Sequence, residues 1–294
     1  MVESKTFTTK LLRTVNYALL SILALSCLYP LWYTLCLSLS DKTAANSGMM
    51  TLWPINFTTI SYREIMKESK FFHSFFISVQ RTVLGTAFTT LVLVLFAYPL
   101  SKTRREFSGV NVFKWSAIFC MVFNGGTIPW YITMVNYGMI DSMIGLILCG
   151  GLPVFNLILI INFFRSLPDS LEEAAVVDGA GPWRILFSIV VPCSVPVLAT
   201  IILFTGVGYW NEFFQGMVLS SSDSNYPLQA YIQQMVVTTQ IDHMSPDQLK
   251  LYSQMSNKSL NAAKVFIAMV PMMCVYPFLQ RYFVTGVLLG AVKG

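Results

Sequence analysis

The densest group of chemically informative side chains lies in residues 163–192. The negative charges of Glu172 and Glu173 would lie near the N-terminus of a helix, where they interact favourably with the positive end of its dipole. Ser170, with Glu173 three positions later, matches a capping box that starts a helix. Gly179 suits the left-handed position that ends one. The stretch is longer than a connector between two helices normally needs, which indicates an element that docks onto a partner.

A second helix is expected after this turn. Pro182 follows Gly181 and suits the first turn of a helix. Pro192 is then expected to bend the chain toward the next apolar run. Ala174 and Ala175 give the first helix a small surface that another backbone could approach. The sequence therefore predicts a helix over 171–178, a turn at Gly179 and a second helix from Pro182.

Catalytic and metal-binding chemistry finds little support in the sequence. The two histidines, His73 and His243, are far apart, and no metal site is expected. The six cysteines form no CxxC pair and lie mostly inside apolar stretches, at Cys27, Cys36, Cys120, Cys149, Cys193 and Cys274. The chain contains no GxxxxGK[ST] loop, so any ATP must be hydrolysed by another protein.

The composition is that of a membrane protein. Hydrophobic residues make up 55% of the 294 residues and charged residues 11%, whereas a soluble protein carries about 25% charged residues. The mean hydropathy is +0.62. Long uncharged runs predict an all-α integral membrane protein, in which residues 1–294 form a single domain. The six predicted transmembrane helices lie at about 15–39, 80–101, 114–135, 142–164, 195–219 and 262–285.

The basic residues predict the orientation of these helices. The net charge is +5, but the basic residues are scattered at the ends of apolar runs and form no stripe for nucleic acid. The cluster at 102–106 lies between two closely spaced spans and favours the cytoplasmic side. Both termini and a loop at 165–193 are then cytoplasmic, and two long loops, 40–75 and 220–260, lie outside.

The loop resembles a known motif. Glu173-Ala174-Ala175, then Gly179 after three residues and Ile189-x-Val191-Pro192 after nine more, is similar to the EAA motif of ABC importer permeases. The wider sequence resembles the carbohydrate-uptake branch, with subunits of the MalG and LplC/YtcP type. The ending, residues 280–294, also resembles that branch. The resemblance covers nearly the whole chain and implies the type I ABC importer permease fold.

The resemblance implies partners and roles for individual residues. The expected partners are a second permease subunit, an ATPase dimer that uses ATP and Mg²⁺, and an extracytoplasmic solute-binding protein in a bacterial plasma membrane. The C-terminal tail would reach the ATPase through Gly290, Lys293 and Gly294. The residues implied in coupling to the ATPase are Glu172, Glu173, Ala174, Ala175, Asp178, Gly179, Arg184 and Pro192.

The resemblance also implies a solute cavity near mid-membrane. Tyr209, Trp210, Asn211 and Glu212 supply polar and aromatic groups, and an acidic residue inside a span is by default a functional candidate. The alternative is that Glu212 is paired or solvated at the outer interface and that the aromatic residues form a headgroup belt. Further candidates for the pathway are Asn124, Trp130 and Asn156.

The expected function is that of a permease subunit in a binding-protein-dependent importer for a sugar or oligosaccharide, without enzymatic activity of its own. Two alternatives remain open at this point: a permease for amino acids or peptides, and a stand-alone secondary transporter. A secondary transporter usually has an internal repeat and intramembrane carboxylates. The two halves show no convincing repeat, and Glu212 is the one carboxylate well within an apolar run.

Overall fold

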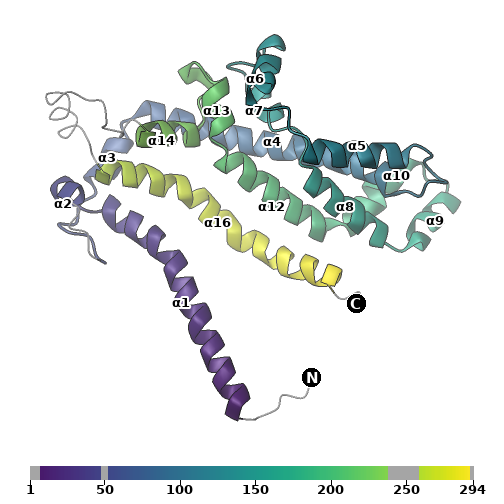
Figure 1. The fold of residues 1–294 in the computed structure, drawn as a ribbon, viewed down its shortest axis with the longest axis horizontal. Helices are drawn as coiled ribbons and strands as arrows, with labels where there is room; N and C mark the ends of the chain where they lie inside the picture. The colour runs from purple at the N-terminus through teal and green to yellow at the C-terminus, as the bar shows by residue number, and fades with distance from the viewer. Residues whose placement is uncertain (1–6, 48–51, 238–257, 292–294) are drawn as a thin grey trace. The chain divides into compact units, whose positions relative to one another are not determined.

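The computed structural model describes residues 7–47, 52–237 and 258–291. Within these ranges all regular secondary structure is helical (Figure 1). The α-helices are α1 (Phe7–Ser38), α2 (Lys42–Ser47), α3 (Ile60–Ile65), α4 (Ser69–Ser101), α5 (Val110–Val122), α6 (Thr127–Asn136), α7 (Met143–Leu148), α8 (Val154–Ser166), α9 (Asp169–Val177), α10 (Pro182–Ile185), α11 (Val191–Cys193), α12 (Val195–Asn211), α13 (Phe214–Leu219), α14 (Leu228–Val237) and α16 (Lys258–Ala291). A π-helical segment (Leu186–Val190) joins α10 to α11, and a short 3₁₀ turn covers Asp223–Asn225.

Three described helices are long and apolar enough to cross a membrane by themselves, in the segments Lys10–Ser38, Ser69–Ser101 and Lys258–Val275. Three further pairs of helices reach that length only together, because each pair is bent. The bends are 114° between α5 and α6, 71° between α8 and α9, and 83° between the α10–α11 segment and α12. By length and composition, the described residues therefore offer three spans, or up to six if each bent pair is one span.

The structure divides three of the predicted span ranges between two helices each. Range 114–135 falls on α5 and α6, 142–164 on α7 and α8, and 195–219 on α12 and α13. At the first break Gly126 has a φ of +89°, and its backbone N–H donates to the Asn124 side chain at 2.8 Å. Hydropathy depends on composition alone, so it does not register such a backbone break inside an apolar run.

The chain divides into two units. The first comprises Met1–Ser69 with Met235–Val270. Buried serines tie its segments together: the Ser61 and Ser259 hydroxyls lie 2.8 Å apart, and Ser259 also donates to the Ser40 carbonyl at 2.8 Å. Lys264 in α16 is 4% exposed and forms an ion pair with Glu68 at 2.6 Å. These bonds join the segment after α1 to the start of α16.

The second unit comprises Lys70–Gln234 with Pro271–Gly294. Its apolar core is built by residues of α4, α8, α9, α10, the π-helical segment and α12, among others. Leu93, Ala97 and Leu100 recur at spacings of four and three on α4, which places them on one helix face. They belong to a core that also contains Ile160 of α8 and Ile201 of α12. Helix α8 packs against both α5 and α12 (Figure 1).

A polar turn in this unit is organised by Asp141. Its carboxylate accepts hydrogen bonds from the backbone N–H groups of Ser221 at 2.7 Å and Ser222 at 2.9 Å. Its backbone N–H donates to the Leu219 carbonyl at 2.8 Å. The N–H group of Ser222 is the main cause that lowers the pKa of Asp141 below its ordinary value of 3.8, and Ser221 adds to it. The turn before α7 is thereby joined to the segment after α13.

Candidate functional site

The turn of the predicted docking loop has the expected backbone. Helix α9 ends at Val177, and Gly179 has a φ of +76°. The N–H of Gly179 donates to the Val176 carbonyl at 3.0 Å, and the N–H of Ala180 donates to the Ala175 carbonyl at 2.9 Å. This pair of bonds is a Schellman motif, which closes a helix through a left-handed residue. The predicted turn at Gly179 is therefore confirmed.

The start of this helix differs from the prediction. Helix α9 begins at Asp169, and Pro168 occupies the N-cap position without a side-chain hydrogen bond. The prediction that Ser170 caps the helix is therefore wrong. Pro182 begins α10, as expected. The main bend toward α12 comes at Ser194, two residues after the exposed Pro192.

Glu172 turns toward its own chain. Its carboxylate forms an ion pair with Lys102 at the end of α4. The Lys102 ammonium also lies 4.6 Å from the centre of the Tyr98 ring. A cavity of about 690 Å³ lies beside this pair. Its walls include Phe107, Val176 and Trp183 from the neighbouring elements.

This pairing narrows the predicted role of Glu172, because its charge is already compensated within the chain. Six other predicted coupling residues are exposed, namely Glu173, Ala174, Asp178, Gly179, Arg184 and Pro192. Ala175 differs from them, since it is 7% exposed and packs into the core. In the predicted tail, Gly290 lies in α16, whereas Lys293 and Gly294 fall outside the described residues. The surface of α9 that is open to a partner is therefore the side turned away from Ala175 and the core, together with the C-terminal end of the helix.

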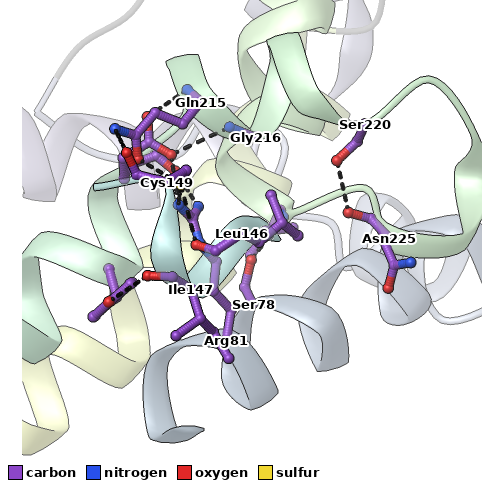
Figure 2. A network of polar contacts seen from close by, with 12 residues as sticks. Ser78, Arg81, Leu146, Ile147, Cys149, Gln215, Gly216, Ser220 and Asn225 are labelled. Carbon is purple, nitrogen blue, oxygen red and sulfur yellow. Dashed lines mark hydrogen bonds and ion pairs between the residues drawn. The ribbon is translucent and has the colours of Figure 1, made fainter. Parts of the chain in front are cut away.

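The same unit also contains a buried ion pair. Arg81 of α4 is 1% exposed, and its guanidinium meets the Glu212 carboxylate at 2.9 Å. It also donates to the carbonyl groups of Leu146 at 3.0 Å and Glu212 at 3.3 Å. Figure 2 shows Arg81 pointing toward Leu146 and Cys149, with Gln215 nearby. One arginine thus joins α4, α7 and the break between α12 and α13.

The surroundings of this pair suit its charges. The Glu212 carboxylate accepts backbone N–H groups of Gln215 at 2.6 Å and Gly216 at 3.3 Å, at the N-terminal end of α13. Arg81 in turn satisfies a carbonyl near the C-terminal end of α7. Tyr209 donates to the neighbouring Ile147 carbonyl at 2.8 Å. A buried charge pair is stable only when such additional hydrogen bonds satisfy its remaining donors and acceptors.

Two cavities with polar groups in their lining lie close to the ion pair, and the smaller one is lined by it. One, of about 240 Å³, is lined by Arg81, Glu212, Tyr209 and Asn156, among others. The other measures about 500 Å³. Its lining residues include Asn124, Trp130, Cys149 and Gln215. Five of the seven predicted pathway residues therefore line one of these two cavities.

The other two predicted pathway residues line neither. Trp210 is 3% exposed and packs edge-on against Phe75, with ring centres 5.8 Å apart. Asn211 is exposed. Glu212 is paired with Arg81, which agrees with one part of the alternative. The outer-interface position and the headgroup belt remain predictions.

Sequence reasoning missed Arg81 and Gln215. Arg81 lies inside α4, at the start of the predicted span 80–101, but no role was predicted for it. A signal was present: Arg81 directly precedes one uncharged run, and Glu212 is the one charge in another. Two lone opposite charges in apolar runs are candidates for pairing with each other. No comparable signal marks Gln215.

Metal ligands form no suitable group in the structure. Among residues 7–47, 52–237 and 258–291, no three His, Cys, Asp or Glu side chains are placed to hold an ion. The geometry instead combines an exposed helical loop with two cavities close to a buried ion pair.

Comparison with known proteins gives the family. Residues 4–288 match the model of the binding-protein-dependent transport system inner membrane component. This chain belongs to that family. It is a permease subunit of an ABC importer, not the ATPase, and it is a multi-pass protein of the bacterial inner membrane.

Two relatives from Bacillus subtilis (strain 168) are similar over most of the permease. The polygalacturonan/rhamnogalacturonan transport system permease protein YtcP is 34% identical over 278 residues, which cover 95% of this chain and 96% of YtcP. Protein LplC is 34% identical over 265 residues, which cover 90% of this chain and 89% of LplC.

A solved structure is also similar. One chain in the crystal structure of a bacterial ABC transporter involved in the import of the acidic polysaccharide alginate is 31% identical to this permease. The match covers 96% of this chain and all of that one, with a TM-score of 0.85. The permease therefore has the type I ABC importer fold, as the sequence predicted.

Proposed function

We propose that this permease subunit forms half of a pathway for a sugar or oligosaccharide. The observation that carries the proposal is the smaller cavity, in which Arg81 and Glu212 neutralise each other. Its remaining polar lining includes the uncharged groups of Asn156 and Tyr209. Neutral hydroxyl and amide groups suit the hydroxyl groups of a saccharide. The names of YtcP and of the alginate transporter support the same class of solute.

The alternative of an amino acid or peptide fits this lining less well. A free amino acid carries an ammonium and a carboxylate at neutral pH. Each needs an opposite charge that is not already compensated if it is to leave water. The two charged residues that line the smaller cavity are paired with each other. The cavity is therefore better suited to an uncharged, hydroxyl-rich part of a solute.

The partners that complete the importer belong to the same proposal. A second, different permease subunit would supply the other half of the pathway, and a solute-binding protein would deliver the saccharide. An ATPase dimer would supply the energy, with ATP and Mg²⁺ bound there and no cofactor in this chain. Its contact surface would be the exposed side of α9 together with Arg184 and the C-terminal tail. Both termini would then be cytoplasmic.

The test uses two asparagines that differ in position. Asn156 is 6% exposed and lines the smaller cavity, whereas Asn211 is exposed and lines neither cavity. In proteoliposomes with the complete importer, Asn156→Ala should lower uptake of a labelled saccharide by about fivefold at low concentration. A hydrogen bond is worth about 1 kcal/mol, which corresponds to that factor. Asn211→Ala is the control and should transport normally.

Equal uptake by the two asparagine variants would sink the proposed pathway. Glu212→Gln is a poorer test, because it leaves Arg81 as an uncompensated buried charge and so destabilises the fold. Uptake of amino acids in place of saccharides would favour the alternative class of solute.

A further inference from the structure

Gln215 is shared by the two polar cavities. It is named in the lining of both the cavity of about 240 Å³ and the cavity of about 500 Å³. Of the adjoining residues, Cys149 lines the larger cavity and Gly150 the smaller one. The Cys149–Gly150 segment and the Gln215 side chain therefore lie between the two spaces.

The Gln215 amide closes against Cys149. Its Oε1 lies 3.0 Å from the Cys149 thiol, and its Nε2 lies 3.5 Å from the Cys149 carbonyl oxygen. A Cβ atom placed on Gly150 would lie 3.7 Å from Oε1. This is an ordinary contact distance, so the amide lies beside Gly150 without requiring glycine there. Figure 2 shows the two labelled residues, Cys149 and Gln215, side by side.

Cys149 itself is held in place from several sides. Its carbonyl oxygen accepts the Trp130 indole N–H at 3.0 Å. Its sulfur lies 3.8 Å from the Arg81 guanidinium. On the other side, the Gln215 backbone N–H is held by the Glu212 carboxylate at 2.6 Å. The backbone on both sides of the contact is therefore anchored, and the Gln215 side chain is the part with freedom to move.

The contact between the two side chains is weak and replaceable. A thiol is a weak hydrogen-bond donor, and the second bond is at the limit of hydrogen-bond distance. The Cys149 sulfur also lies 3.3 Å from the Leu146 carbonyl oxygen, and a single S–H can donate fully to only one acceptor. If Gln215 rotates away, the thiol keeps that acceptor. The freed amide can then bond to hydroxyl groups in the cavity.

We propose that Gln215 is a movable partition between the two cavities and that Cys149 is the fixed side against which it closes. The inference rests on the proposed function only in assigning both cavities to the solute pathway. When the amide swings aside, the two spaces join into one passage. Gln215 is then a positioning residue that sets the width of this passage during the transport cycle.

The test measures access to the Cys149 thiol. The assembled importer, with its partner permease and ATPase, is treated with N-ethylmaleimide, and alkylation of each cysteine is followed by peptide mass spectrometry. Two states are compared: the resting complex, and the complex trapped with MgATP and vanadate. Cys36, which is 1% exposed and lies in the other unit, is the internal reference for general loosening.

In the wild-type chain Cys149 should react slowly at rest and roughly tenfold faster in the trapped complex, since a local opening exposes it. Gln215→Ala should react fast in both states. Gln215→Met keeps the bulk of the side chain and should remain slow at rest. Gln80→Ala is the matched control, because Gln80 is exposed on α4 and lines neither cavity.

Slow alkylation of Cys149 in resting Gln215→Ala would overturn the partition. Equal rates in the two states of the wild-type chain would overturn its movement. If alkylation of Cys36 is also faster in Gln215→Ala, that variant is loosened in general. The alkylation rates of Cys149 in the resting and trapped states of the wild-type and Gln215→Met chains then test the proposal. No solute is needed, so the result is independent of the uptake test on Asn156. A pathway that fails that test can still contain a partition, and the reverse also holds.

Discussion

At the scale of single residues, Gly85 lets an aromatic ring lie directly on helix α4. A Cβ atom at this position would lie 2.7 Å from Cζ of Tyr209, closer than real contacts allow. The ring cannot easily yield, because the Tyr209 hydroxyl is hydrogen-bonded to Ile147 and lies 2.9 Å from the Thr89 hydroxyl. The small residue is therefore required by packing between α4 and α12.

Gly85→Ala should destabilise the permease by about 1–3 kcal/mol, the usual cost of overpacking. The measurement is thermal unfolding of the purified protein in detergent. Gly208→Ala in α12 is the control, since a Cβ atom there meets nothing within 4 Å. That change should be neutral or slightly stabilising, because alanine favours a helix. Equal melting temperatures for the two variants would contradict the packing argument.

Two threonines on α4 are both buried but differ in their hydrogen bonds. Thr86 is 9% exposed and its hydroxyl has no hydrogen-bond partner among the described residues, whereas the Thr89 hydroxyl is paired with Tyr209. Thr86→Val should leave stability unchanged or raise it, because it removes an unsatisfied polar group. Thr89→Val should cost about 1 kcal/mol. Unfolding the two variants under the same conditions checks that Thr86→Val is the more stable one.

At the scale of elements, the end of α9 depends on Gly179. A valine there would have to adopt a left-handed backbone, which costs an L-residue roughly 1–2 kcal/mol or more. Gly179→Val should therefore distort the turn and uncouple ATP hydrolysis from transport. The ratio of solute moved to ATP hydrolysed in proteoliposomes measures this effect.

Gly181→Ala is the matched control for this turn. Gly181 has an ordinary φ of −77°, and a Cβ atom there meets nothing within 4 Å. This variant should couple normally. Normal assembly and normal uptake in Gly179→Val would refute a coupling role for the turn.

The sequence predicted the elements of this loop unevenly. Gly179 and Pro182 were placed correctly because each has a strong backbone preference. The start of α9 was misplaced by two residues, since Pro168 takes the N-cap position that the Ser170 side chain was expected to fill. The break at Asn124 to Gly126 was not predicted, because it lies in an uncharged run and hydropathy does not see it.

The sequence predicted only part of the candidate site, and the reason is geometric. Successive residues on a helix point about 100° apart, so four consecutive side chains cannot share one face. Tyr209 and Glu212 reach the smaller cavity, but Trp210 packs into the interior and Asn211 is exposed. Arg81 and Glu212 are 131 positions apart. Their lone opposite charges made them candidates for pairing, but only the fold shows that the two side chains meet.

At the scale of the whole molecule, Asp141 makes stability depend on pH. Its folded-state pKa is lowered, so its contribution is present above about pH 4 and is lost as the pH falls through that lowered value. Asp141→Asn removes the charge but retains an acceptor and tolerates the positive φ of 52°.

The melting temperature of Asp141→Asn should lie below that of the wild-type chain at about pH 6, and the gap should shrink toward about pH 3 as Asp141 becomes protonated. Thermal unfolding in detergent across this range measures the gap. A gap of constant size would show that the Asp141 charge makes no contribution.

The ion pair between Arg81 and Glu212 has a consequence for how the protein is made. Arg81 is synthesised 131 residues before Glu212, so its guanidinium enters the membrane environment without a counter-ion. An arginine in a spanning helix is costly, by roughly 2.5–3.5 kcal/mol at the helix centre on insertion scales. Arg81 directly precedes the uncharged run 82–101, so that value is an upper bound for it. The α4 segment should therefore settle fully only once α12 has been inserted. Stable membrane insertion of α4 therefore depends on a residue that is made much later. Truncated chains that end before Glu212 should be susceptible to quality-control proteolysis.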